Sequence, residues 1–132
     1  MAQLLSYSVT IRNEMLDRIT ANVGGSGFLR IYDGTRPATG GAATTLLAEL
    51  TGNATFAPAA AGAVLTLNAI TQDSSANATG TATWARWVSS GGTFCVGMNV
   101  GTSGADLNLT TTLINAGQPV SVSTFTITEG NP

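Results

Sequence analysis

The sequence predicts a mainly β protein, an eight-stranded antiparallel jelly-roll-like β-sandwich that begins with one short N-terminal helix. One stretch near the start has apolar residues at helical spacing. The remainder consists of about eight short strand-like runs at roughly ten-residue spacing, separated by Gly, Asn and Ser. The length of 132 residues fits a single domain spanning residues 1–132. An immunoglobulin-like sandwich or a small barrel fits the same strand spacing, so the strand order stays open.

An apolar stripe predicts the helix over about residues 9–23. The stripe consists of Ile11, Met15, Leu16, Ile19 and Val23, which recur at helical spacing. Ser8 or Thr10 can cap the start of the helix, and Gly24 gives it a place to end. We expect the stripe to pack on the protein's own sheet; alternatively, the helix is an arm that docks on a neighbouring molecule.

The first strands follow the helix and are separated by turn residues. The runs with strand character are 28–33, 46–51, 64–67 and 69–72. In the first of them, alternation puts Leu29 and Ile31 on one face and Arg30 on the other. Residues 34–45 are rich in Gly, Ala and Thr without periodicity, so we predict a long flexible loop there.

The clearest hairpin signal lies between the runs 79–88 and 93–100, which flank two Ser and two Gly. Trp84 and Trp87 are three residues apart in the first of these runs, so they point to opposite faces. A three-residue turn over 90–92 would direct Trp84 to the core, whereas a two-residue turn would direct Trp87 to it. We favour the three-residue turn and expect Trp87 to lie outside the core, at a subunit contact; alternatively, the ring outside the core is partly covered beside Arg86 or a loop.

The last two runs are 107–114 and 119–128. In the second run, Val122 and Phe125 have opposite parity, so a regular strand could turn only one of them to the core. We therefore predict a β-bulge near residues 123–124 that buries both side chains.

The composition excludes much catalytic chemistry. Only 9% of the residues are charged, the five cations are all arginine, and the chain has no His and one Cys. Without imidazole or lysine, the chain cannot build a Ser-His-Asp relay, a lysine Schiff base or an ordinary zinc site. Asp33, Asp73 and Asp106 stand alone at turns, where we expect them to cap the backbone rather than bind calcium. We expect no enzyme activity, no cofactor and no metal.

The charge pattern argues against two further classes of partner. The formal net charge is −2 and the arginines are scattered, which leaves no basic patch for nucleic acid. No run of about 20 apolar residues is present to span a membrane. We therefore expect neither nucleic acid nor a membrane as partner.

A surface this poor in charge indicates a subunit of an assembly, because charge normally protects proteins against association. The candidate interface residues are Arg12, Arg18, Arg36 and Trp87. Arg36 is the one charge of the 34–45 loop, and its planar guanidinium matches a carboxylate on a partner. Sheet edges without lysine favour self-association, so we expect a homodimer, with a trimer as the second choice.

Four segments of the sequence resemble a known family. They are Leu29–Pro37 (LRIYDGTRP), Thr45–Leu50 (TLLAEL), Asp73–Trp84 (DSSANATGTATW) and Ser121–Thr128 (SVSTFTIT). The chain is similar in these segments to small structural proteins of tailed-phage virions, most of all to the capsid cement, or head-decoration, proteins of short-tailed phages. Proteins of this kind are β-sandwiches, some of them jelly rolls, and they are often dimeric or trimeric.

The resemblance implies a non-enzymatic protein of the virion, located on the capsid exterior. There it would bridge and stabilise neighbouring subunits of the major capsid protein. Two alternatives stay open: a tail, neck or fibre-associated structural protein, and a carbohydrate-binding β-sandwich module, which would present exposed aromatic side chains to a sugar.

Overall fold

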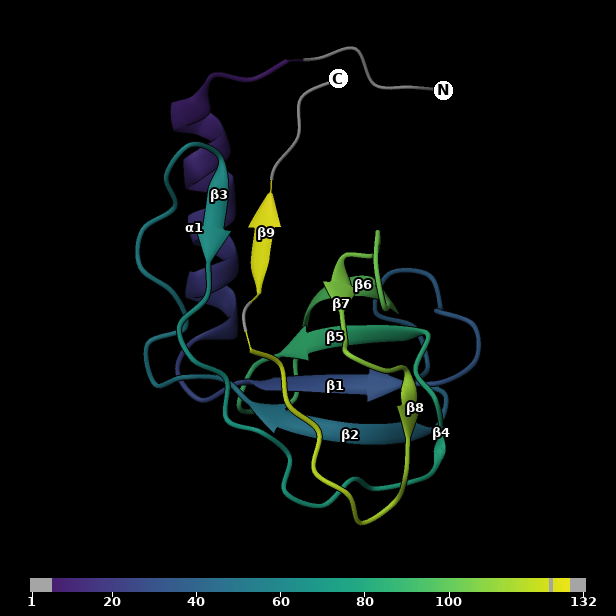
Figure 1. Cartoon of the computed structure of the whole chain (residues 1–132). Helices are drawn as coiled ribbons and strands as arrows, with labels where there is room; N and C mark the ends of the chain where they lie inside the picture. The colour runs from purple at the N-terminus through teal and green to yellow at the C-terminus, as the bar shows by residue number, and fades with distance from the viewer. Residues whose placement is uncertain (1–5, 124, 129–132) are drawn as a thin grey trace.

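The computed structural model describes residues 6–123 and 125–128, which form one helix and nine short strands (Figure 1). The elements are α1 (Val9–Val23), β1 (Phe28–Tyr32), β2 (Leu46–Thr51), β3 (Val64–Thr66), β4 (Gly80–Thr81), β5 (Trp84–Val88), β6 (Phe94–Gly101), β7 (Leu107–Asn108), β8 (Leu113–Ile114) and β9 (Thr126–Thr128). This part of the chain is mainly β with one helix, as predicted. Figure 1 shows α1 standing beside β3 and β9, with β1, β2 and β5 lying across its lower end.

The strands form one five-stranded sheet and two separate pairs. The large sheet has the order β2-β1-β5-β6-β7 and is antiparallel except that β7 runs parallel to β6. The pairs are β3 with β9 and β4 with β8. This arrangement differs from eight antiparallel strands, and jelly-roll connectivity is not confirmed. Two predicted runs divide because their halves pair with different strands: 79–88 into β4 and β5, and 107–114 into β7 and β8.

The helix has the predicted bounds because local signals set both of its ends. The Ser8 hydroxyl oxygen accepts a hydrogen bond from the Ile11 N–H at 3.2 Å, which satisfies a backbone donor of the first turn. At the other end, Gly24 takes a positive φ of 70° and donates its N–H to the Thr20 carbonyl oxygen at 3.0 Å.

The apolar stripe of α1 does not pack along its whole length on the sheet. Leu16 and Val23 are buried, but Ile11 and Met15 are 45% and 39% exposed. Residues four apart on a helix are separated by about 400° of rotation, so each step along the stripe turns it by about 40°. The stripe therefore winds from the buried side at Val23 to the outer side at Ile11, and the expectation that all of it packs on the sheet is corrected.

The polar side of α1 is instead joined to the connection between β2 and β3. The Asn13 side-chain oxygen accepts the Ala63 N–H, and an Asp17 carboxylate oxygen accepts the Ala60 N–H, both at 2.8 Å. Buried or half-buried backbone donors need such partners. These two bonds fix the rotation of the helix about its axis and direct Ile11 outward.

One hydrophobic core joins the large sheet, α1 and the two strand pairs. The predicted alternation of β1 is confirmed, because Leu29 and Ile31 are fully buried in this core while Arg30 is half-buried on the other face. Trp87 of β5 also belongs to the core. It lies opposite Leu29 in the sheet and meets Phe56 edge to face, with ring centroids 4.9 Å apart.

The burial of Trp87 reverses the predicted roles of the two tryptophans. The three-residue turn is present, since the Ser89 N–H donates to the Thr93 carbonyl oxygen at 2.9 Å and Val88 lies opposite Phe94. A bulge between Trp87 and Val88 then shifts the register by one residue, so that Trp87 pairs with Val96 and faces the core. Trp84 faces the opposite side of the sheet.

The prediction for the last run is confirmed for its side chains. Val122 and Phe125 are both 6% exposed and belong to the core. The Phe125 carbonyl oxygen accepts the Leu67 N–H at 3.0 Å, which holds this segment beside β3. Thr124, where we predict the bulge, lies outside the described residues.

Candidate functional site

The three turn aspartates are used to hold backbone, as predicted. Asp33, Asp73 and Asp106 each accept at least one backbone N–H through the carboxylate, at 2.9–3.1 Å. Within residues 6–123 and 125–128, no group of three His, Cys, Asp or Glu side chains is placed to hold a metal ion. These carboxylates therefore act as turn caps.

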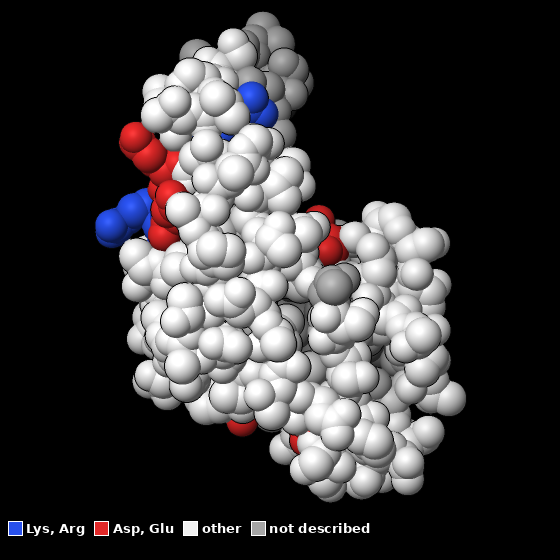
Figure 2. Space-filling model, turned by 60° about the vertical axis from the view of Figure 1, so that its left-hand side comes forward, with Lys and Arg blue, Asp and Glu red and all other residues white. Residues whose placement is uncertain are grey.

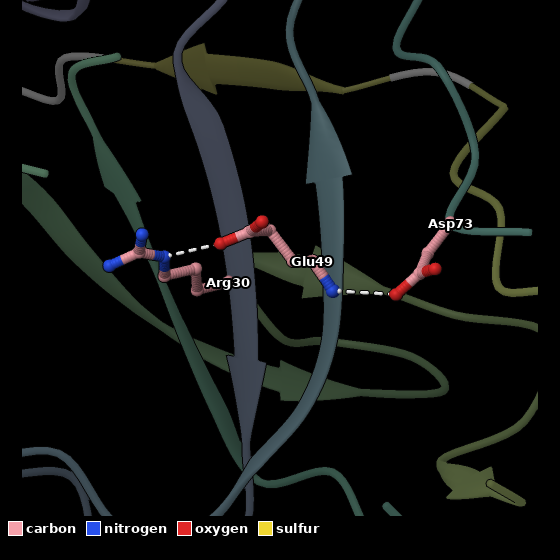
Figure 3. A network of polar contacts seen from close by, with 3 residues as sticks. All are labelled: Arg30, Glu49 and Asp73. Atoms are coloured by element: carbon pink, nitrogen blue, oxygen red, sulfur yellow. Dashed lines mark hydrogen bonds and ion pairs between the residues drawn. The ribbon is translucent and has the colours of Figure 1, made fainter. Parts of the chain in front are cut away.

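Arg30, Glu49 and Asp73 form a network of polar contacts (Figure 3). The Arg30 Nε lies 2.7 Å from a Glu49 carboxylate oxygen, and the Glu49 backbone N–H donates to Asp73 at 2.9 Å. Figure 3 shows that the network crosses from β1 over β2 to the segment that carries Asp73. It ties three segments together: β1, β2 and the segment that carries Asp73.

Cys95 has the environment of a structural cysteine. Its side chain is half-buried on β6, and burial raises the pKa of the thiol above its ordinary value. A raised pKa lowers the thiolate fraction at neutral pH, and the thiolate is the nucleophilic form. The side chain therefore suits packing better than chemistry.

The outer face of the large sheet carries a second cluster, which the 34–45 loop covers. Trp84 stacks on Tyr32 with ring centroids 4.3 Å apart, and the Arg86 guanidinium lies 5.2 Å from the Tyr32 ring centroid and 5.4 Å from that of Trp84. The Trp84 indole N–H lies 2.8 Å from the Asp33 carbonyl oxygen and 3.0 Å from the Thr44 hydroxyl. Trp84 is 1% exposed as a result.

The loop itself contains no helix or strand, as predicted. The Thr83 hydroxyl donates to the Gly34 carbonyl oxygen at 2.6 Å, and Arg86 donates to the Gly41 carbonyl oxygen at 3.0 Å. These contacts attach the loop at Gly34 to Thr83, which precedes β5, and at Gly41 to Arg86 of β5. The mobility of the loop stays a prediction.

A groove of about 350 Å³ lies between this loop and the outer face of β5 and β6. It is lined by Arg36, Pro37, Ala38, Thr39, Gly40, Trp84, Arg86, Phe94 and Gly97. We call it the arginine groove. Two of the chain's five arginines line it, and none of its lining residues is acidic.

The outer side of α1 forms an apolar surface, which we call the α1 surface and define by Ile11 and Met15, about 40° apart around the helix. These side chains are 45% and 39% exposed, whereas Val9, 45% exposed in the first turn, lies about 160° from Ile11 around the helix. Arg18 is exposed as well and lies about 20° from Ile11 around the helix. Figure 2 shows that most of the visible surface is uncharged, and that its few charged side chains gather mainly on the upper part, where Figure 1 places α1.

The structure does not bring the four predicted interface residues together. Arg12 is half-buried and Arg18 exposed on α1, whereas exposed Arg36 lies in the loop at the far end of β1. Trp87 is 0% exposed, so its predicted place at a subunit contact is wrong: the bulge beside it turns the ring inward.

Arg86 lines the groove together with Arg36 but was not identified from the sequence. The available signal was that Arg86 interrupts an otherwise apolar strand face between Trp84 and Val88. A charged side chain at that position indicates that this face of the strand is covered by another segment rather than by the main hydrophobic core.

The sheet edge at β2 is less open than expected. Thr51 and Thr71 exchange backbone hydrogen bonds of 3.1 and 2.8 Å, and the Asn77 N–H donates to the Leu47 carbonyl oxygen at 2.8 Å. The segment that follows β3 therefore covers this edge, and self-association through β2 would require it to move.

Comparison with known proteins adds no assignment. No family model matches the chain, and neither a curated protein nor a solved structure matches it. Among the described residues, no helix is long and apolar enough to cross a membrane.

Proposed function

We propose that this chain is a non-enzymatic structural protein of a phage virion, a cement protein on the capsid exterior. It bridges and stabilises neighbouring subunits of the major capsid protein. The observation that carries the proposal is the α1 surface: a capped helix, held in place by polar contacts, presents Ile11 and Met15 on one outer side. Together with the family resemblance of the sequence, this helix is best explained as a docking arm.

The way α1 is held supports a docking role. The hydrogen bonds of Asn13 and Asp17 to the 60–63 segment fix the helix before any partner arrives. A surface that is already ordered loses little conformational entropy on binding. The exposed apolar side chains can therefore contribute most of their burial energy, on the order of 1 kcal/mol each for half-exposed groups.

The low charge of the surface supports repeated contacts of this kind. Only 9% of the residues are charged, so few charges must be stripped of water when the protein is covered by a partner. Many modest contacts on a symmetric lattice add up to strong retention. A cement protein needs this combination more than it needs any one tight contact.

The finer fold and the oligomer belong to the same proposal. We propose a relative of the jelly-roll-like sandwich in which the β3–β9 and β4–β8 pairs cover the large sheet, because one core joins them. We also propose a homodimer, with a trimer second, whose contact does not include Trp87.

The copy number of the chain in purified virions tests the proposal. Virions of the phage that encodes it are quantified by mass spectrometry against the major capsid protein. A cement protein is expected on the order of hundreds of copies per particle. About a dozen or fewer would indicate the tail, neck or fibre alternative, and absence from the particle would contradict a virion protein.

The carbohydrate-binding alternative loses the feature that favoured it. Among the described residues, the large hydrophobic side chains that are exposed are Val9, Ile11, Met15 and Leu113, none of them aromatic. Both tryptophans are buried. No platform of exposed aromatic rings supports a sugar-binding role.

A further inference from the structure

The arginine groove concentrates positive charge in a chain that has little charge anywhere. Arg36 and Arg86 line it, and the other lining residues are uncharged. By contrast, Arg30 on the same face of the sheet is paired with Glu49. The groove therefore has unbalanced positive charge beside a wall of aromatic and small side chains.

The Arg86 guanidinium is held in a fixed position, and not all of its N–H donors are used. The group lies over the Tyr32 and Trp84 rings, and one terminal nitrogen donates to the Gly41 carbonyl oxygen at 3.0 Å. Its Nε is buried and has no hydrogen-bond partner among the described residues. A partner cannot reach this buried Nε, but a guanidinium carries five N–H donors, and the terminal N–H groups not used by Gly41 are free to bind an acceptor from outside.

Arg36 is the second arginine that lines the groove. It is exposed and makes no hydrogen bond or ion pair with any described residue. Its side chain passes close to Gly97: a Cβ added there would lie 3.9 Å from the Arg36 Cδ. The absence of a side chain at Gly97 keeps the groove open between Arg36 and the Phe94 ring.

We propose that the arginine groove binds a carboxylate side chain on an acidic segment of a protein partner, with Arg36 and Arg86 as its charged donors. The proposal rests on the proposed function in one respect, the identity of the protein that supplies the acidic segment. Planar guanidinium groups match the two oxygens of a carboxylate. Phe94 and Pro37 line the same groove, so an apolar residue next to the acid finds a contact as well. The net charge of −2 does not favour a polyanion such as nucleic acid.

The shape of the groove depends on one glycine of the loop. Gly40 has a φ of 68°, a conformation that residues with a side chain rarely adopt, and a Cβ there would lie 3.2 Å from the Phe94 ring. The loop thus passes close over Phe94, and Gly40 lines the groove there.

Peptide binding to the isolated protein tests the proposal. The probe is an N-acetylated, C-amidated Gly-Asp-Leu-Asp-Gly peptide, and the matched control replaces both aspartates with asparagine. Nitrogen-15 NMR follows the side-chain N–H signals of Arg86 and Trp84 during the titration. We expect the aspartate peptide to shift these signals and the asparagine peptide to leave them unchanged.

Variants identify the donor. Arg36→Gln should weaken the aspartate peptide about tenfold, as expected for one lost charge-assisted hydrogen-bond pair. Arg18→Gln removes an exposed arginine on α1 and should leave the affinity unchanged. Equal affinity for the two peptides, or an unchanged affinity in Arg36→Gln, would overturn the proposal.

A further titration separates a protein segment from a small free anion. Sodium acetate that binds as tightly as the peptide would overturn the role of a protein segment, because the groove would then recognise a small anion alone. The titration uses the isolated protein without virions. A negative result would therefore contradict carboxylate binding in the groove but not the proposed virion function. Absence of the chain from virions would remove the proposed function and leave the peptide result standing.

Discussion

Replacing Trp87 with alanine tests the corrected position of this ring. The side chain is 0% exposed, lies opposite Leu29 and meets Phe56 at 4.9 Å. Trp87→Ala should lower the free energy of unfolding by about 3–5 kcal/mol, the usual range for a buried aromatic ring. We expect the upper part of this range, because a Cβ at Gly52 would come within 3.0 Å of the Trp87 ring. The Gly52 N–H donates to the Gly27 carbonyl oxygen at 2.7 Å, so this backbone cannot easily move into the space that the ring leaves.

The assay is urea unfolding followed by circular dichroism, with the slope of free energy against urea compared between variants. A similar slope means that the loss belongs to the native contacts rather than to a changed unfolded state. For a chain of 132 residues, the expected fall in Tm is roughly 10–20 °C. Ile11→Ala is the matched control, since it truncates a 45% exposed side chain and should cost less than about 0.5 kcal/mol.

A phenylalanine variant keeps the reasoning testable if the alanine variant does not fold. The Trp87 Nε1–H is buried without a hydrogen-bond partner among the described residues, and such a donor costs about 1–3 kcal/mol. Trp87→Phe removes that donor along with part of the ring, so it should cost clearly less than the alanine variant. A loss under about 1 kcal/mol for Trp87→Ala, typical of surface positions, would refute the burial of this ring.

Three further predictions follow from the core, the helix cap and the thiol. Phe125→Ala should lower the free energy of unfolding by about 3–5 kcal/mol in the same urea assay, because the ring is 6% exposed; a surface-like loss would place Phe125 outside the core. Ser8→Ala should cost about 1 kcal/mol, measured by thermal unfolding, because it removes the acceptor of the Ile11 N–H, and no change in Tm would mean that this cap is not formed. Cys95 should react with iodoacetamide at pH 8 more slowly than in the urea-unfolded chain, because burial raises the pKa of its thiol in the folded state. Equal alkylation rates in the folded and unfolded chain would contradict the burial. Because the thiol pKa is higher in the folded state, the stability linked to this thiol is fully present below the pKa of the unfolded chain and is lost as pH rises through the pKa of the folded protein.

The parts of the fold that local signals determine could be predicted from the sequence. Ser8 and Gly24 mark the ends of α1, and both ends lie where these residues place them. The alternation of Leu29 and Ile31 gave the buried face of β1 for the same reason, since a strand's periodicity is local.

The parts that depend on tertiary contacts could not be predicted. The bulge beside Trp87 has no sequence signal of its own, yet it decides which tryptophan enters the core. The rotation of α1 depends on Asn13 and Asp17 finding backbone donors some 40 to 50 residues away in sequence, so the apolar stripe alone pointed to the wrong face for Ile11.

The candidate site divides in the same way. Arg36 could be identified because it is the one charge in a loop without periodicity. Arg86 interrupts an apolar strand face in the sequence, but its place beside Arg36 could not be predicted, because only the folded loop brings residues 36 and 86 to one groove.

Binding of the purified protein to particles that lack it tests the docking role of α1 most directly. The variant carries Ile11→Asp and Met15→Asp on the α1 surface, and the control carries Leu113→Asp, which changes a 56% exposed apolar side chain on β8. Bound copies per particle are counted after sedimentation, with Tm measured for each protein. The wild type and the Leu113→Asp control should bind alike, while the double variant should bind at least about tenfold more weakly with little change in Tm, because roughly 2 kcal/mol of apolar contact is replaced by charge. Equal occupancy by the double variant and the wild type would contradict the role of α1 as the docking arm.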